Sequence, residues 1–211
     1  MNAAGSIEFA LARMQARLSR RPSAAAWAAI EEARSVAPVL DAARHTTLAP
    51  LVAALPGAPD LAAVDRAARA AWSLAVREAA AWMPPRWRAA IAWCDAPAAA
   101  AAGARPHPTL LPSLGHEEWR RRWPAQSRGD PDLVALSHLF VLHLARFRHA
   151  APHEAVSLRR HFEEKLLAVM RRRPMRPVAA FAWLALTALD LERARGEIER
   201  RLAFPAARIA A

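Results

Sequence analysis

Alanine content constrains the fold of this chain more than any other feature. The 211 residues include 56 alanines but only 19 valine, isoleucine and threonine residues together. Alanine has the highest helix propensity of all residues, whereas β-branched residues are enriched in strands. The composition therefore predicts an all-α protein. A chain of this length, about one to one and a half typical domains, is long enough to bury a hydrophobic core.

Prolines and glycines divide the chain into helical segments, because proline lacks an amide donor and disfavours helix at the residue before it. The apolar periodicity between these breaks predicts about eight helices, and no segment predicts a strand. The expected helices cover residues 6–20, 23–35, 39–45, 61–82, 86 into the alanine run 98–102, 116–123, 131–149, 154–173 and 177–204. We expect one compact helical domain over residues 1–211, with the loop 103–115 as the best candidate for an internal boundary.

Capping residues mark several helix starts. Ser23, Asp60 and Asp130 each precede an expected helix, and their side-chain oxygens can accept bonds from the first free amides of that helix. Pro131 then occupies the first helical position, where the missing amide donor costs least. Pro152 predicts a break between the helices expected at 131–149 and 154–173.

The sequence lacks the local motifs that identify most enzyme classes. It has no G-x-x-x-x-G-K-[ST] loop for a nucleotide phosphate, and no G-x-S-x-G, H-E-x-x-H or G-x-G-x-x-G. The single cysteine, Cys94, excludes a disulfide framework and a multi-thiolate zinc site within one chain. We therefore expect a non-catalytic protein without a cofactor.

The sequence shows no secretion signal and no membrane-spanning segment. Glu8 and Arg13 interrupt the stretch where a signal peptide needs an unbroken apolar core. The most apolar window, residues 178–189, has 12 residues, fewer than the roughly 20 needed to cross a bilayer. Together with the single cysteine, this predicts a cytoplasmic protein in which the window is a buried helix.

Histidines cluster late in the chain and raise the question of a metal site. Within 24 residues lie His138, His143, His149, His153 and His161. His149 and His153 have the i, i+4 spacing of helical ligands, but Pro152 breaks the turn between them. We expect capping, interface or exposed histidines and no metal. Glu163 and Glu164 point about 100° apart on a helix, so we expect a solvated face rather than a paired acid and base.

The net charge of +11 comes almost entirely from arginine: 29 arginines and one lysine, Lys165, oppose 19 acidic residues. A basic surface attracts acidic proteins, phospholipid headgroups or nucleic acid in a salt-sensitive way. The densest basic runs are Arg120, Arg121 and Arg122, and Arg171, Arg172 and Arg173. Both runs are candidate contacts to an acidic partner. Trp119 and Trp123 share one helical face beside the first run, which leaves open aromatic packing flanked by solvated arginines.

The last expected helix combines two different halves. Residues 177–189 are apolar on nearly every face, so neighbouring helices should enclose them. Residues 190–201 alternate acidic and arginine side chains, which favours projection into solvent or contact with a polar partner. The candidates for polar coupling to a partner are Asp190, Glu192, Arg193 and Arg195.

The order of these segments resembles the family of central-stalk adaptor subunits in V-type and archaeal-type rotary ATPases, the non-catalytic helical subunits at the foot of the central shaft. An arginine-bearing first helix, a short second helix and a leucine-containing helix that leads into threonine carry the first part of the resemblance, in Phe9, Arg13, Arg17, Leu40, Thr46 and Thr47. Residues 62–95, the segment LLPSLGHEEWRRRW at 110–123 and the helical pair at 157–204 are also similar to that family. Its members are usually longer, with three helical lobes around a cavity, so the resemblance implies one or two such lobes here.

The resemblance implies a mechanical function. The chain would be an all-helical, non-catalytic adaptor at the inner face of the membrane, joining the rotor ring to the central shaft in ATP-driven proton or ion transport. Its partners would be those other rotary-ATPase subunits. The charge of +11 favours an alternative, an arginine-rich helical nucleic-acid-binding protein. The late histidines, with Glu154 or Glu163, leave a helical metalloenzyme as a third hypothesis.

Overall fold

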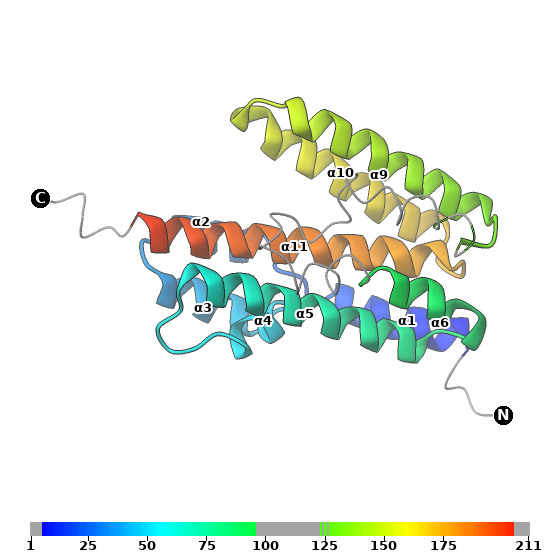
Figure 1. Ribbon diagram of the computed structural model, residues 1–211, viewed down its shortest axis with the longest axis horizontal. Coiled ribbons are helices and arrows are strands. Elements are labelled where there is room, and N and C mark those ends of the chain that lie inside the picture. Colours follow the sequence, from blue (N-terminus) through cyan, green and yellow to red (C-terminus); the bar gives the residue numbers. More distant parts are fainter. Residues whose placement is uncertain (1–5, 96–122, 124, 126, 205–211) are drawn as a thin grey trace, which may run out of the picture.

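A computed structural model describes residues 6–95, 123, 125 and 127–204, and over these residues the protein is all helical (Figure 1). The helices are α1 (Ile7–Leu18), α2 (Ala24–Glu32), α3 (Val36–Arg44), α4 (Ala49–Ala53), α5 (Leu61–Trp82), α6 (Pro85–Trp93), α9 (Pro131–His149), α10 (Pro152–Arg172) and α11 (Val178–Ala203). The prediction of an all-α fold with about eight helices is confirmed. Among the described residues, none of these helices is long and apolar enough to cross a bilayer.

The last helix, α11, runs through the middle of the molecule. It lies antiparallel to α5, and α1, α2, α3, α9 and α10 also pack against it (Figure 1). Every residue from Val178 to Leu186 is buried. The prediction that neighbouring helices enclose the apolar half of this helix is therefore confirmed.

Alanine makes close packing between α5 and α11 possible. The buried face of α5 consists mainly of alanines, with Val64, Trp72 and Val76 between them. Small side chains let two helix axes approach closely, and the few large side chains then fill the remaining space. The composition that favours helix locally thus also determines how the helices pack.

The predicted caps at three helix starts are present. The side chain of Ser23 accepts a bond from the amide of Ala26 at 3.1 Å, and Asp60 accepts one from Ala63 at 2.6 Å. Asp130 accepts bonds from the amides of residues 132 and 133 at 3.0 and 3.2 Å. The break at Pro152 is also confirmed, because α9 ends at His149 and α10 begins at Pro152.

An antiparallel hairpin of α9 and α10 lies across α11, and its free end points away from the other helices (Figure 1). Aromatic contacts join its two helices. The ring of Phe162 stacks on His143, with centroids 4.1 Å apart, and meets Phe140 edge-on at 5.1 Å. Trp123 packs edge-on against Phe181 of α11 at 5.5 Å. The hairpin is thus anchored at one end only.

Two differences from the expected helices concern short elements. The five-residue α4 was not expected, because so few residues show no apolar period. α3 begins at Val36 rather than Val39, since Pro38 lies in its first turn, where a helix needs no amide donor. The alanine run 98–102, the loop 103–115 and nearly all of the helix expected at 116–123 lie outside the described residues.

Candidate functional site

The charged half of α11 is paired within the chain. Asp190 is 4% exposed and accepts two bonds from Arg21, which follows α1: Nε to Oδ2 and Nη2 to Oδ1, both at 2.7 Å. Glu163 of α10 accepts a further bond from Nη2 of Arg21 at 2.9 Å. Asp190 therefore does not project into solvent as predicted, and Glu163 does not belong to a solvated face. A partner could reach Asp190 only by displacing Arg21.

Burial and pairing act against each other in this cluster. Burial raises the pKa of Asp190, and the bonds from Arg21 limit that rise. Burial also disfavours the charged form of Arg21, but the hydrogen bonds and charges of Asp190 and Glu163 outweigh it and raise its pKa. The guanidinium therefore stays protonated and provides a full charge partner to the buried carboxylate.

A second cluster joins α11 to α5. Arg195 donates to Glu192 at 2.8 Å, and its Nη1 lies 3.3 Å from Oδ1 of Asp65. Asp65 is also paired with Arg69 on α5. The side chains of Glu192 and Arg195 are only 15% and 13% exposed. Two more of the residues expected at a partner surface are thus mostly buried between helices.

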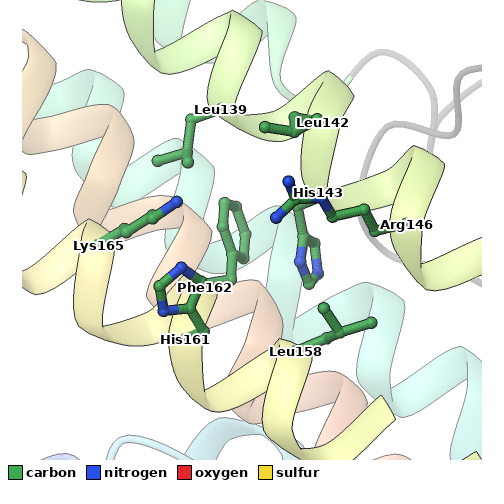
Figure 2. A pocket seen from close by; sticks show the side chains of 8 residues that line it. All are labelled: Leu139, Leu142, His143, Arg146, Leu158, His161, Phe162 and Lys165. Atoms are coloured by element: carbon green, nitrogen blue, oxygen red, sulfur yellow. The ribbon is translucent and has the colours of Figure 1, made fainter. Parts of the chain in front are cut away.

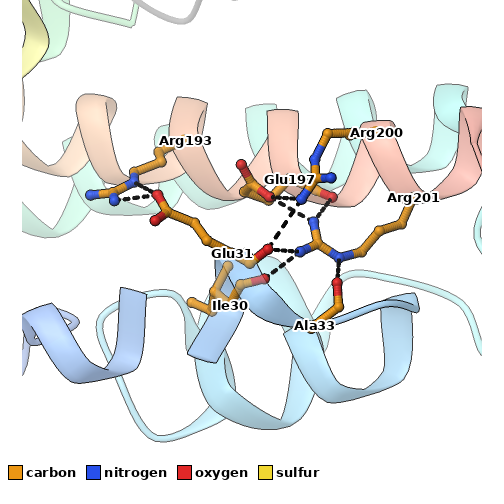
Figure 3. A network of polar contacts seen from close by, with 7 residues as sticks. All are labelled: Ile30, Glu31, Ala33, Arg193, Glu197, Arg200 and Arg201. Atoms are coloured by element: carbon orange, nitrogen blue, oxygen red, sulfur yellow. Dashed lines mark hydrogen bonds and ion pairs between the residues drawn. The ribbon is translucent and has the colours of Figure 1, made fainter. Parts of the chain in front are cut away.

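The end of α11 closes the end of α2 (Figure 3). Arg201 is 4% exposed and donates to the backbone oxygens of Ile30, Glu31 and Ala33. The last carbonyls of a helix have no partner within it, so this guanidinium replaces the missing amides. Arg193 donates to the Glu31 carboxylate, with its guanidinium over a tryptophan ring of α2 at 4.1 Å. Of the four residues selected on α11, only Arg193 lies at the edge of a packed helix pair.

The two basic runs have different positions. Arg120, Arg121 and Arg122 lie outside the described residues. Arg171 and Arg172 are exposed at the end of α10, and neither forms an ion pair with a described residue. Arg173 lies 3.4 Å from the carboxylate of Asp132 on α9. Two of the six selected arginines are therefore available, in this part of the chain, for an acidic partner.

A groove follows the seam between α9 and α10. Its α9 side is lined by Asp132, Ala135, Leu136, Leu139, Leu142, His143 and Arg146. Its α10 side is lined by Leu158, His161, Phe162, Lys165, Ala168, Val169 and Arg172, with Arg173 and Val178 beyond α10. Both sets recur at three- and four-residue steps, so each occupies one face of its helix. The two narrower stretches share Leu139 and Lys165, which makes them one continuous groove.

The groove is wide at one end and narrow at the other. The wide end, from Leu139 and Lys165 to Arg172, has a volume of about 590 Å³. The narrow end, closed by His143 and Phe162, has a volume of about 20 Å³ and is drawn in Figure 2. A space of that size is large enough for a single water molecule. A ligand group larger than a water can therefore enter only at the wide end or lie over the seam.

The groove has an apolar floor and a cationic rim. Arg146, His161, Lys165 and Arg172 line the rim, and none of the four forms an ion pair with a described residue. Asp132 is the acidic lining residue, and Arg173 and Arg176 both lie within 3.4 Å of its carboxylate. Glu164 is exposed beside the rim on α10. The arrangement fits binding of an anionic, partly apolar ligand.

His143 does not behave as a metal ligand in this site. It is 8% exposed, and burial, with the charge of Arg159, lowers its pKa to about 4. Its ring lies flat against Phe162, at an interplanar angle of 6°. Within the described ranges, no three His, Cys, Asp or Glu side chains come close enough together to hold a metal ion. His143 instead serves as an aromatic packing residue of the hairpin.

Sequence reasoning missed the groove, although a signal for it existed. Lys165 is notable in the sequence as the single lysine, and Arg146 was not selected at all. The three- and four-residue steps from 132 to 146 and from 158 to 172 mark one face on each helix. The antiparallel pairing of those two faces is what creates the groove, and the pairing became visible only in the structure.

The chain was compared with known protein families, with curated proteins and with solved structures. None of the three comparisons found a match.

Proposed function

We propose that this chain is a non-catalytic helical adaptor that binds an acidic surface of a partner protein. The observation that carries the proposal is the α9–α10 groove, whose rim cations Arg146, His161, Lys165 and Arg172 have no acidic partner among the described residues. Arginines in the core are treated differently, because Arg21 and Arg195 are neutralised by buried carboxylates. Like charges along one surface repel one another, and an acidic partner relieves that repulsion.

The resemblance to the central-stalk adaptor of rotary ATPases supports a more specific version. In that version the partner is the rotor ring or the central shaft of such an enzyme, and the chain lies on the cytoplasmic face of the membrane without crossing it. This assignment rests on the segments 6–47, 62–95, 110–123 and 157–204 of the sequence. The adaptor function rests on the groove and does not depend on it.

Affinity capture tests the proposal. The tagged protein is used to recover partners from gently solubilised native membranes, with and without nuclease, and the partners are identified by mass spectrometry. Rotary-ATPase subunits that remain after nuclease treatment are the expected result. Recovery of other proteins with acidic surfaces would keep the adaptor function and remove the rotary-ATPase assignment. Partners that all disappear with nuclease would contradict both.

Nucleic-acid binding is the second candidate, and one observation favours it. Arg146, Arg148 and Arg160 near the free end of the hairpin are exposed and form no ion pair with a described residue. Nucleic-acid phosphates would release counterions there, so binding should weaken steeply with salt. A measured affinity for RNA or DNA that exceeds that of an unstructured peptide of equal charge, at the same salt, would support this candidate.

A further inference from the structure

We propose that the groove between α9 and α10 is the docking site for an acidic amphipathic helix of the partner protein. This inference rests on the proposed adaptor function and names its site and the class of its partner. Two antiparallel helices leave a seam, and a third helix that lies in the seam packs against both. Three features of the groove identify a helix as its occupant.

The first feature is length. On α9 the lining residues extend from Asp132 to Arg146, and 14 residues of α-helix rise about 21 Å. A partner helix of about four turns covers that distance. A small ligand would occupy only the wide end.

The second feature is the spacing of the cations. His161, Lys165 and Arg172 follow one face of α10 over 11 residues, which corresponds to about 17 Å. A single phosphate or carboxylate headgroup reaches one of them at a time. Carboxylates on successive turns of a helix recur about every 5–6 Å, so one acidic helix face can contact the whole row.

The third feature is the apolar floor. Leu139 and Val169 are half-buried, and Leu142 remains 47% exposed. Leucines of a partner helix would remove these side chains from water, whereas a nucleic-acid backbone would not. The aromatic ring beneath the groove, Phe162, is buried and cannot stack on a base. The observations therefore favour a protein helix over nucleic acid.

A designed peptide tests the groove directly. The probe is a fluorescein-labelled 16-residue peptide with leucines at helical i, i+3, i+4 and i+7 positions and glutamates on the flanking faces. Its control has the same composition with the leucines scrambled. Fluorescence anisotropy at 150 mM salt should show that the full-length protein binds the amphipathic peptide about tenfold or more tightly than the scrambled one. Equal binding of both peptides would overturn the proposal.

Two variants with matched charge locate the binding. The groove variant Arg146→Glu/Lys165→Glu/Arg172→Glu should lose about tenfold or more in affinity for the probe. The control variant Arg20→Glu/Arg34→Glu/Arg160→Glu carries the same charge change at exposed positions outside the groove. It should stay within about twofold of the parent. Equal losses would show general attraction to a chain of charge +11 and would overturn the proposal.

A third variant tests the floor without changing charge. Leu142→Ser should weaken binding of the probe several-fold while the circular dichroism spectrum stays unchanged, because the side chain is exposed in the free protein. Unchanged binding would overturn the role of the apolar floor. Concentration-dependent dimers that Leu142→Ser abolishes would identify a second copy as the occupant and overturn the proposal. Tighter binding to vesicles of anionic phospholipid, in competition with the probe, would identify a membrane surface and overturn it as well.

The groove and the adaptor function can fail separately. If the groove variant still captures the same nuclease-resistant partner as the parent protein, the groove is not the docking site and the adaptor function stands. If the parent protein binds the probe as expected but captures no protein partner, the groove stands and the adaptor function fails.

Discussion

Arg21 and Asp190 form a two-bond ion pair across 169 positions of the chain, with both contacts at 2.7 Å. Arg21 lies in the link between α1 and α2, and Asp190 lies midway along α11. The charge that was expected on the surface of α11 thus holds an early segment of the chain against its central helix.

The first prediction concerns this pair. Asp190→Ala should lower the free energy of unfolding by about 3 kcal/mol, because it leaves the buried Arg21 with Glu163 as its only remaining carboxylate among the described residues. Urea unfolding followed by circular dichroism measures the change.

An exposed pair provides the control. Arg44 and Asp41 lie 3.3 Å apart with side chains 60% and 70% exposed, so Asp41→Ala should change the unfolding free energy by less than about 0.5 kcal/mol. The double variant Arg21→Met/Asp190→Leu should recover most of the loss, since no charge then remains buried without a partner. Similar losses for the two aspartates would contradict the role assigned to Asp190.

The second prediction compares two adjacent arginines. Arg201→Lys should lower the unfolding free energy by about 2 kcal/mol, because an ammonium cannot donate to Ile30, Glu31 and Ala33 at once. Arg200 is 55% exposed, and Arg200→Lys should cost less than about 0.5 kcal/mol. Hydrogen exchange of α2 amides should increase only in the Arg201 variant. Equal exchange in both variants would argue against the closing role of Arg201.

The third prediction is a pH dependence of stability. The pKa of His143 lies at about 4, below the usual value of 6.5, because the ring is buried and faces Arg159. Between these values the unfolded chain binds a proton that the folded chain does not. The free energy of unfolding should therefore fall, by about 1–2 kcal/mol, as the pH decreases from about 6.5 to about 4.

Unfolding titrations at pH 7.5, 5.5 and 4.5 check this dependence. His143→Leu should remove that part of the decrease which belongs to His143, while other groups contribute equally to both proteins. His138→Leu serves as the matched control, because His138 is exposed on the same helix. A parent protein and a His143→Leu variant with identical pH profiles would show that His143 does not contribute.

The fourth prediction concerns Cys94. Burial, with the charge of Asp95, raises the pKa of the Cys94 thiol to about 12. Because only the thiolate attacks a disulfide reagent, the folded protein should react with Ellman's reagent at pH 8 about a hundredfold more slowly than the protein in urea. An exposed thiol introduced by Ala145→Cys, in a Cys94→Ala background, should react at a similar rate in both states. Rapid labelling of native Cys94 would contradict the prediction.

Helix starts could be predicted from the sequence because a cap is a local interaction. Asp60 and Asp130 each bind amides within three residues of themselves, so a short window contains donor and acceptor together. The break at Pro152 follows in the same way from a single missing amide. The apolar half of α11 was also predictable, because a helix without a polar face must be enclosed.

The role of the charged half of α11 could not be predicted in this way. Its partners lie 130 to 171 positions away, in α5, in α2 and in the link after α1. Alternating charges look the same in a solvated helix and in one that pairs with other helices. Glu163 and Glu164 show the point within two residues: the first binds Arg21, whereas the second is exposed.

The place of α11 in the chain has a consequence for synthesis. α11 leaves the ribosome after all the other described helices, although α1, α2, α3, α5, α9 and α10 pack against it. Until it emerges, the apolar faces of α5 and α10 have no cover, and Arg21 has no Asp190 to bind. The nascent chain is therefore the form of this protein most exposed to aggregation, and a ribosome stalled before residue 178 carries helices that have nothing to fold around.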